Sequence, residues 1–119
     1  MQEGQVWEAA MSASHHKLNS LICIIDRNNV QIDGFTNSVM NIEPLNKKWE
    51  SFGWNVSECD GNDFNSIENC FTNLKINKPN VIIANTKMGK GISELENDYN
   101  WHGKAPNNEE CQKFLEQLK

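Results

Sequence analysis

Three short predicted strands alternate with segments of helical periodicity, and this order constrains the fold of the 119-residue chain more than any other feature. Residues 21–26 open with five apolar residues and no alternation, Asn55–Cys59 predicts a second short strand, and Val81–Ala84 predicts a third. Unalternating apolar strands are typical of parallel sheets covered on both faces. Strands that alternate with helices predict right-handed parallel crossovers, and therefore an α/β fold.

Helices are predicted where apolar residues recur at three- and four-residue spacing. The first predicted helix, Val6–His16, is apolar on most sides and is expected to be buried. Pro44 suits the first turn of the second, Gly53 suits its end, and Asp63 is a natural N-cap for the third. The apolar positions of the second, third and terminal helices are Leu45, Trp49 and Phe52, then Phe64, Ile67, Cys70, Phe71 and Leu74, then Cys111, Phe114, Leu115 and Leu118.

Composition excludes several classes of protein. The chain has 16 acidic and 11 basic residues, and a net charge of −5 argues against a nucleic-acid or anionic membrane surface. No run of eighteen apolar residues predicts a membrane span, and the N-terminus lacks the pattern of a secretory signal. The four cysteines form no Cys-x-x-Cys pair, so we expect reduced core thiols in a cytoplasmic protein.

A polar bend, Asp26–Gly34, follows the first predicted strand. It carries the Asn28 amide and a free backbone carbonyl, and hard divalent cations take such oxygen ligands. Ligands of open parallel sheets bind beyond the carboxyl ends of strands, where Gly34–Asn41 and Thr86–Asn108 form long, irregular connections. An Asn-Asn pair alone is usually an ordinary turn, so this bend is a candidate metal loop only together with its flanks.

Three motifs give the bend a context. Ile25-Asp26-Arg27-Asn28 with Gln31-Ile32-Asp33-Gly34 resembles the close of the thiamine-diphosphate signature, and residues 2–10 look like the segment after its Gly-Asp-Gly opening. Residues 101–106 are similar to the His-Gly-x-Ala-Pro segment of transketolases. Since all three lie in the family's order and spacing, the chain resembles the transketolase family over essentially its whole length.

The resemblance implies a three-layer α/β sandwich with a parallel sheet, the thiamine-diphosphate-binding fold. Residues 1–119 would form part of its diphosphate-half domain. In the family, a strand carrying the metal-binding Asp ends immediately before the position of Gln2, so we expect a fold that lacks the N-terminal strand or strands. The chain would then be a truncated fragment or a split N-terminal subunit with an open sheet edge.

Residue roles follow from the same resemblance. Asn28 would give its side-chain carbonyl, and Val30 its main-chain carbonyl, to Mg²⁺ or Ca²⁺ beside thiamine diphosphate. Ile32 matches a residue packed on the thiazolium ring, although simple core packing also explains an Ile there. Met88 matches an apolar contact to the cofactor rings, although Met is a common gap-filler.

His102 is the catalytic candidate implied by the resemblance. The matching His of transketolases lies beside the diphosphate and the reacting carbon, where imidazole can bind phosphate and assist proton movement. A lone His in a loop is more often a surface residue, and only its setting favours the site role. Glu3 corresponds to an acid at the family's subunit interface, unless it is simply frayed at the N-terminus.

The implied function is part of a transketolase, which transfers a two-carbon ketol unit from a ketose phosphate to an aldose phosphate in the pentose phosphate pathway. The expected partner is a pyrimidine-domain (C-terminal) subunit, or a second copy of the chain. The isolated chain is expected to be inactive, because the activating Glu belongs to another domain. The alternatives are a non-catalytic remnant, an interaction module, or a generic nucleotide-binding domain, which the absence of Gly-x-Gly-x-x-Gly disfavours.

Overall fold

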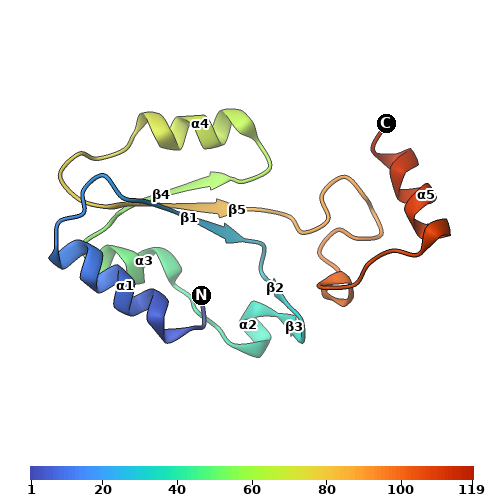
Figure 1. Cartoon of the computed structure of the whole chain (residues 1–119), viewed down its shortest axis with the longest axis horizontal. Coiled ribbons are helices and arrows are strands. Elements are labelled where there is room, and N and C mark those ends of the chain that lie inside the picture. The colour runs from blue at the N-terminus through green and yellow to red at the C-terminus, as the bar shows by residue number, and fades with distance from the viewer. The chain divides into compact units, whose positions relative to one another are not determined.

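A computed structural model describes residues 1–119, whose contacts form two compact units (Figure 1). The first unit comprises residues 1–27 and 42–86, and the second comprises residues 28–41 and 87–119. The elements of the first unit are α1 (Gly4–His15), β1 (Ile22–Arg27), α3 (Leu45–Ser51), β4 (Asn55–Asp60), α4 (Phe64–Thr72) and β5 (Asn80–Asn85). Those of the second are β2 (Val30–Gln31), β3 (Gly34–Phe35), α2 (Thr36–Val39), the 3₁₀ helix η1 (Tyr99–Trp101) and α5 (Asn108–Gln117).

The first unit is built on a parallel sheet of three strands in the order β1-β5-β4. The central strand β5 pairs with both neighbours, so that Ile83 lies opposite Ile25 of β1 and Glu58 of β4. Four consecutive residues of β5, residues 81–84, are buried, as the sequence predicts for an inner strand. The parallel α/β architecture is therefore confirmed.

Helices cover both faces of this sheet (Figure 1). On one face α1 and α3 enclose the larger core, and Trp54 donates its indole N–H to the Ala10 carbonyl at 2.9 Å. On the other face α4 packs against β4 and β5 through Cys70. The larger core comprises Ala10, Ala13, Ile25, Leu45, Trp49, Trp54, Val81 and Ile83, and the smaller one Cys59, Cys70, Ile82 and Ala84.

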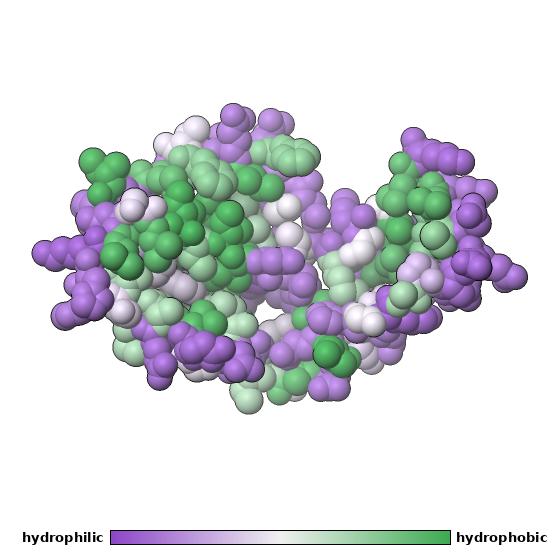
Figure 2. Space-filling view, viewed as in Figure 1, coloured by the Kyte–Doolittle hydropathy of each residue, from purple (hydrophilic) through white to green (hydrophobic).

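The first strand is less buried than its sequence indicates. Ile22 and Ile24 are 37% and 60% exposed, because β1 lies at an edge of the sheet and pairs only with β5. Their face of β1 meets no helix, since α4 packs against the other two strands. Figure 2 shows hydrophobic side chains gathered over this part of the first unit. The expectation of a strand covered on both faces is therefore wrong for β1.

The helices also bury less than their sequences indicate. Only Ala10 and Ala13 of α1 are buried, because a single face of this helix meets the sheet. In α4, Phe64 is 89% exposed although it falls on the predicted apolar face. The cap prediction holds, since the Asp63 carboxylate accepts the backbone N–H of Ser66 at 2.9 Å.

The second unit contains structure where the sequence predicts irregular connections. β2 and β3 form an antiparallel hairpin across Ile32 and Asp33, and α2 follows at once. Gly34 directly follows this two-residue loop and adopts a φ of +144°. Residues with a side chain rarely take this conformation, so a glycine suits the start of β3. Residues 86–107 are irregular as predicted, apart from η1.

All four cysteines are free thiols. Burial, with the neighbouring Cys70, raises the pKa of Cys59 to about 11, so this thiol stays protonated and unreactive near neutral pH. None of the helices is both long and apolar enough to span a membrane.

Candidate functional site

All but one of the predicted site residues belong to the second unit. This unit consists of the segments that follow the carboxyl ends of β1 and β5. It contains the five predicted metal, cofactor and catalytic residues, which are Asn28, Val30, Ile32, Met88 and His102. Glu3 belongs to the first unit, where it is exposed and precedes α1 without a capping hydrogen bond, and its interface role stays a prediction.

The two predicted metal ligands lie in one turn. The Val30 N–H donates to Asn28 Oδ1 at 3.0 Å, and Asn29 between them has a φ of +63°. The Thr36 N–H donates to the Asn29 carbonyl at 2.9 Å, whereas Val30 lies opposite Phe35 in the hairpin.

This register fixes the direction of the Val30 carbonyl. The bond from the Thr36 N–H to the Asn29 carbonyl flanks the pair of Val30 and Phe35, which is therefore a non-hydrogen-bonded pair of the antiparallel ladder. The N–H and C=O of Val30 consequently both point out of the hairpin, on the same side. Since the N–H reaches Asn28 Oδ1, the Val30 carbonyl lies on that side of β2 as well.

The donor set of the loop fits a hard cation. Amide and main-chain carbonyl oxygens are the ligands that Mg²⁺ and Ca²⁺ accept, and Mg²⁺ keeps few protein ligands. Next to Val30, the Gln31 Oε1 atom is buried without a hydrogen-bond partner, which leaves one more oxygen acceptor in this loop. No group of three His, Cys, Asp or Glu residues that could hold a metal ion is present, so the candidate ligands in this chain are the amide and main-chain oxygens.

Ile32 lies in the two-residue loop that follows β2. Its side chain is 70% exposed, so simple core packing does not explain it. Met88 is half-buried, and its carbonyl accepts the Asn97 N–H at 3.0 Å, which holds the backbone beside it. Ile and Met side chains that are at least partly exposed are of the kind on which an aromatic ring packs.

His102 is presented at the end of η1. Its N–H donates to the Tyr99 carbonyl at 2.9 Å, and its exposed imidazole makes no hydrogen bond. The Tyr99 ring packs edge-on against Phe35 of β3, with centroids 5.6 Å apart. This contact joins the hairpin that follows the Asn28 turn to the short helix that leads into His102.

The loop after β5 is braced by charges. Lys87 Nζ lies 2.8 Å from Glu96, whose other oxygen accepts the Gly91 N–H at 3.2 Å. The hydrogen bond from Lys87, followed by that from Gly91, lowers the pKa of the Glu96 carboxyl, which is therefore ionised. Lys104 Nζ lies 3.8 Å from the centre of the Trp101 ring. Both lysines thus hold the second unit together.

Two residues of the Asn28 loop region escape prediction from sequence. Gln31 lies in the quoted motif, but only the structure reveals its unpartnered oxygen. Arg27 precedes Asn28, and its guanidinium is held by Glu43 and Asn85. A charged residue ending an apolar strand is the available signal, but it does not identify the partners.

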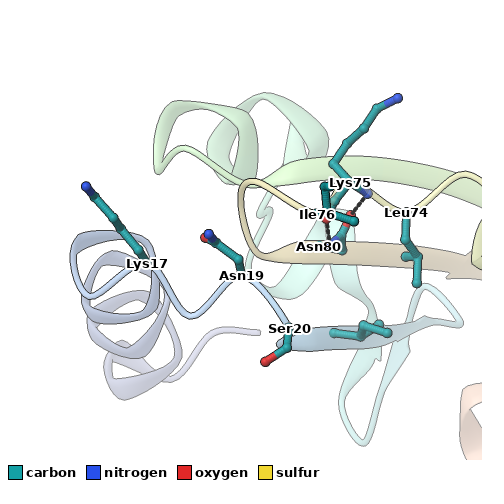
Figure 3. Close-up of a pocket in the computed structure, with 8 residues that line it drawn as sticks. Lys17, Asn19, Ser20, Leu74, Lys75, Ile76 and Asn80 are labelled. Atoms are coloured by element: carbon teal, nitrogen blue, oxygen red, sulfur yellow. Dashed lines mark hydrogen bonds between the residues drawn. The ribbon is translucent and has the colours of Figure 1, made fainter.

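A pocket of about 500 Å³ lies at the amino ends of β1 and β5 (Figure 3). It is lined by Lys17, Asn19, Ser20, Ile22, Leu74, Lys75, Ile76 and Asn80. The Lys17, Ser20 and Lys75 side chains point away from one another in Figure 3. The Asn80 amide is already bonded to the Lys75 N–H and carbonyl, each at 2.8 Å. The polar groups that line this pocket therefore do not converge on a common point where a ligand could bind.

A parallel sheet with ligand-type oxygens in the loop after its first strand is the arrangement typical of ligand-binding α/β domains. Residues 1–118 match the family described as transketolase, thiamine diphosphate binding domain. One subunit of an apulose-4-phosphate transketolase from Actinobacillus succinogenes is 47% identical over 118 residues. A 6-deoxy-6-sulfo-D-fructose transketolase subunit from a Clostridium species is 44% identical over 96 residues. The crystal structure of Campylobacter jejuni transketolase superposes with a TM-score of 0.87 at 36% identity.

The chain belongs to the transketolase family. The alignments cover 98% of it with the Actinobacillus subunit, 79% with the Clostridium subunit and 98% with the Campylobacter enzyme. The chain spans 43%, 35% and 18% of the lengths of these three proteins. It therefore corresponds to part of a transketolase subunit.

Proposed function

We propose that residues 1–119 are part of the diphosphate-half domain of a transketolase that transfers a two-carbon ketol unit between sugar phosphates. The observation that carries this proposal is the Asn28–Val30 turn, whose two oxygens lie on one side of β2, within a family match over residues 1–118. The family match identifies the chain as a member of the transketolase family. The turn adds a chemical reason to propose a cation site in this part of the chain.

In this proposal Asn28 Oδ1 and the Val30 carbonyl hold Mg²⁺, or Ca²⁺, against the diphosphate. Ile32 and Met88 pack on the cofactor rings. His102 would donate a hydrogen bond to phosphate and would hold or release a proton at its imidazole, for which a side chain without other hydrogen bonds is suited. Thiamine diphosphate, when bound, supplies the nucleophilic carbon that the side chains of this protein lack.

A second chain would supply the pyrimidine half of the enzyme. The Actinobacillus relative is named as one subunit of a transketolase, and we propose that the partner is a pyrimidine-domain subunit, with Glu3 at the interface. The names of the two relatives point to anionic ketoses as the substrate class, a phosphate in one and a sulfonate in the other. We place the protein in the cytoplasm, where its four free thiols would remain reduced.

Calorimetric titration of the full chain with thiamine diphosphate, with and without Mg²⁺, tests the binding role. Binding should depend on the metal and should weaken at least tenfold in Asn28→Ala, since both the ligand and the Val30 bond are lost. Asn37→Ala, on an exposed Asn of the same unit, is the matched control and should bind like the natural chain. The proposed cation site would be excluded if thiamine diphosphate bound without the metal. It would also be excluded if Asn28→Ala and Asn37→Ala bound thiamine diphosphate with equal affinity.

Turnover tests the need for a partner. The chain alone should not convert xylulose 5-phosphate and ribose 5-phosphate, whereas activity should appear when the upstream part of the diphosphate half and a pyrimidine-domain subunit are both supplied. Turnover by the purified chain alone would contradict the proposal that another domain is required.

The open edge of β1 favours self-association as a second possibility. β1 pairs on one side only, and Ile24 on its uncovered face is 60% exposed. Such edges pair with other chains. If two copies associate here, light scattering should report a dimer that Ile24→Lys converts to a monomer. Monomers at all concentrations would rule this assembly out.

A further inference from the structure

We propose that Arg27 is a positioning residue for the Asn28–Val30 turn, an inference that rests on the proposed cation role of that turn. Arg27 is the only arginine of the chain and the last residue of β1, and Asn28 follows it directly. It does not need to touch a ligand to act. Its side chain and backbone fix the point from which the turn begins.

The guanidinium is held from two sides. Its Nε donates to Glu43 Oε1 at 2.9 Å, its Nη2 donates to the same carboxylate, and its Nη1 donates to Asn85 Oδ1 at 2.8 Å. Charge-assisted bonds from a planar fork fix both the position and the orientation of the group.

Both partners are themselves held by the core of the first unit. Glu43 Oε2 accepts the N–H of Leu45 at 2.9 Å, and Leu45 is 1% exposed at the start of α3. Asn85 ends β5 opposite Arg27, and its amide donates to the Cys59 carbonyl of β4 at 3.4 Å. Arg27 therefore connects the end of β1 to α3, β5 and β4.

The backbone at the end of β1 is held as well. The Arg27 carbonyl accepts the Thr86 N–H at 3.4 Å, and the Thr86 hydroxyl donates to the Asp26 carboxylate. One peptide bond later the chain reaches Asn28, whose oxygen is the first proposed ligand. Since Mg²⁺ demands near-octahedral geometry, small displacements of this oxygen weaken Mg²⁺ binding more than Ca²⁺ binding.

Direct contact of Arg27 with the diphosphate is the competing role. Its Nε, Nη1 and Nη2 donate to Glu43 and Asn85, and the Glu43 carboxylate balances its charge. The two roles predict opposite effects of Glu43→Gln. Weakening the clamp should lower affinity if Arg27 positions the turn. A guanidinium released toward phosphate should raise affinity if Arg27 binds the ligand.

The test uses the full chain and the variants Arg27→Ala, Arg27→Lys and Glu43→Gln. Lys47→Ala, which removes an exposed ion pair with Glu50 on α3, is the matched control. The first measurement is amide hydrogen exchange over residues 28–36 compared with β4, without any ligand. The second is the affinity for thiamine diphosphate measured with Mg²⁺ and with Ca²⁺.

Positioning by Arg27 predicts faster exchange over residues 28–36 in Arg27→Ala, with unchanged exchange in β4. It also predicts Mg²⁺-supported affinity about 10- to 100-fold lower, the range found for residues that orient metal ligands, with a smaller loss in Ca²⁺. Arg27→Lys should partly recover the slow exchange and the Mg²⁺-supported affinity. Glu43→Gln should resemble Arg27→Ala in both measurements. Lys47→Ala should change neither.

The two measurements separate the inference from the proposed function. Unchanged exchange over residues 28–36, or higher affinity in Glu43→Gln, overturns the positioning role while leaving the cation site in place. If the natural chain binds no cofactor but exchange accelerates in Arg27→Ala, the proposed function fails and Arg27 still positions the turn.

Discussion

Gln117 of α5 donates through Nε2 to the Glu94 carboxylate at 2.6 Å, so the terminal helix is bonded to the loop that follows β5. The Gln117 side-chain oxygen accepts the Ser93 N–H at 3.0 Å, and Lys113, one turn earlier on α5, forms an ion pair with Glu94. α5 therefore holds the loop segment that also contains Met88 through the carboxylate of Glu94 and the N–H of Ser93.

The stability of the chain should depend on pH through Glu94. Hydrogen bonds from Gln117, then from Lys113, lower the pKa of this carboxyl from 4.5 to about 2. A carboxyl with a depressed folded-state pKa stabilises the folded state above its unfolded pKa, and this contribution disappears as pH falls through the folded value. The loss should therefore occur between about pH 4.5 and about pH 2.

Urea unfolding of the natural chain and of Glu94→Gln measures this contribution. The natural chain should be more stable at pH 6, and the difference should shrink progressively as pH falls below 4.5. Glu116→Gln, an exposed change on the same helix, is the control and should show a small difference throughout. A constant difference between the natural chain and Glu94→Gln from pH 6 to pH 3 would mean that this bond does not stabilise the fold.

Gly89→Ala should destabilise the second unit. Gly89 has a φ of +69°, and a Cβ there would lie 2.6 Å from Leu95 Cβ and 2.7 Å from the Leu95 carbonyl. Overpacking against backbone costs about 1–3 kcal/mol, in addition to about 1 kcal/mol for a left-handed residue. Gly103→Ala is the matched control, with a φ of +86° but open space, so only the smaller cost applies. Equal unfolding free energies of the two variants would disprove the Leu95 contact.

Ile32→Ala should separate binding from stability. Because Ile32 is 70% exposed, its truncation should change the unfolding free energy by less than about 0.5 kcal/mol. If its side chain packs on a cofactor ring, partial burial of three carbon atoms is lost, which is about 1 kcal/mol or roughly fivefold in affinity. Val39→Ala, another exposed apolar residue of this unit, should leave affinity unchanged. Unchanged affinity in Ile32→Ala would remove Ile32 from the site.

His102→Asn should affect catalysis and not folding. No hydrogen bond involves the imidazole, so the unfolding free energy should stay within about 0.5 kcal/mol of the natural value. In an enzyme assembled from this chain, the upstream part of the diphosphate half and a partner subunit, the loss of a general acid–base should reduce the rate by about 10²- to 10⁴-fold. His16→Asn, at the end of α1, serves as control. A reconstituted His102→Asn enzyme with full activity would leave His102 as a surface residue.

The local pattern of the sequence determines the element types, because strand and helix periodicity are properties of neighbouring residues. Residues 81–84 specify the buried centre of β5, and Asp63 specifies the start of α4, whose first N–H groups its carboxylate accepts. The family follows from three motifs and their spacing, because their order along the chain needs no tertiary information.

Only the tertiary structure decides what covers each surface and which side chains meet. Ile24 has the sequence of a buried strand, but its exposure depends on whether a helix packs on that face of β1. Arg27 meets Glu43 and Asn85 across 16 and 58 residues of chain, and a local pattern carries no record of such distant partners. The sequence thus determines which chemical groups enter the loops, and long-range packing determines how they are held, because the packing energy belongs to pairs of residues that only the fold brings together.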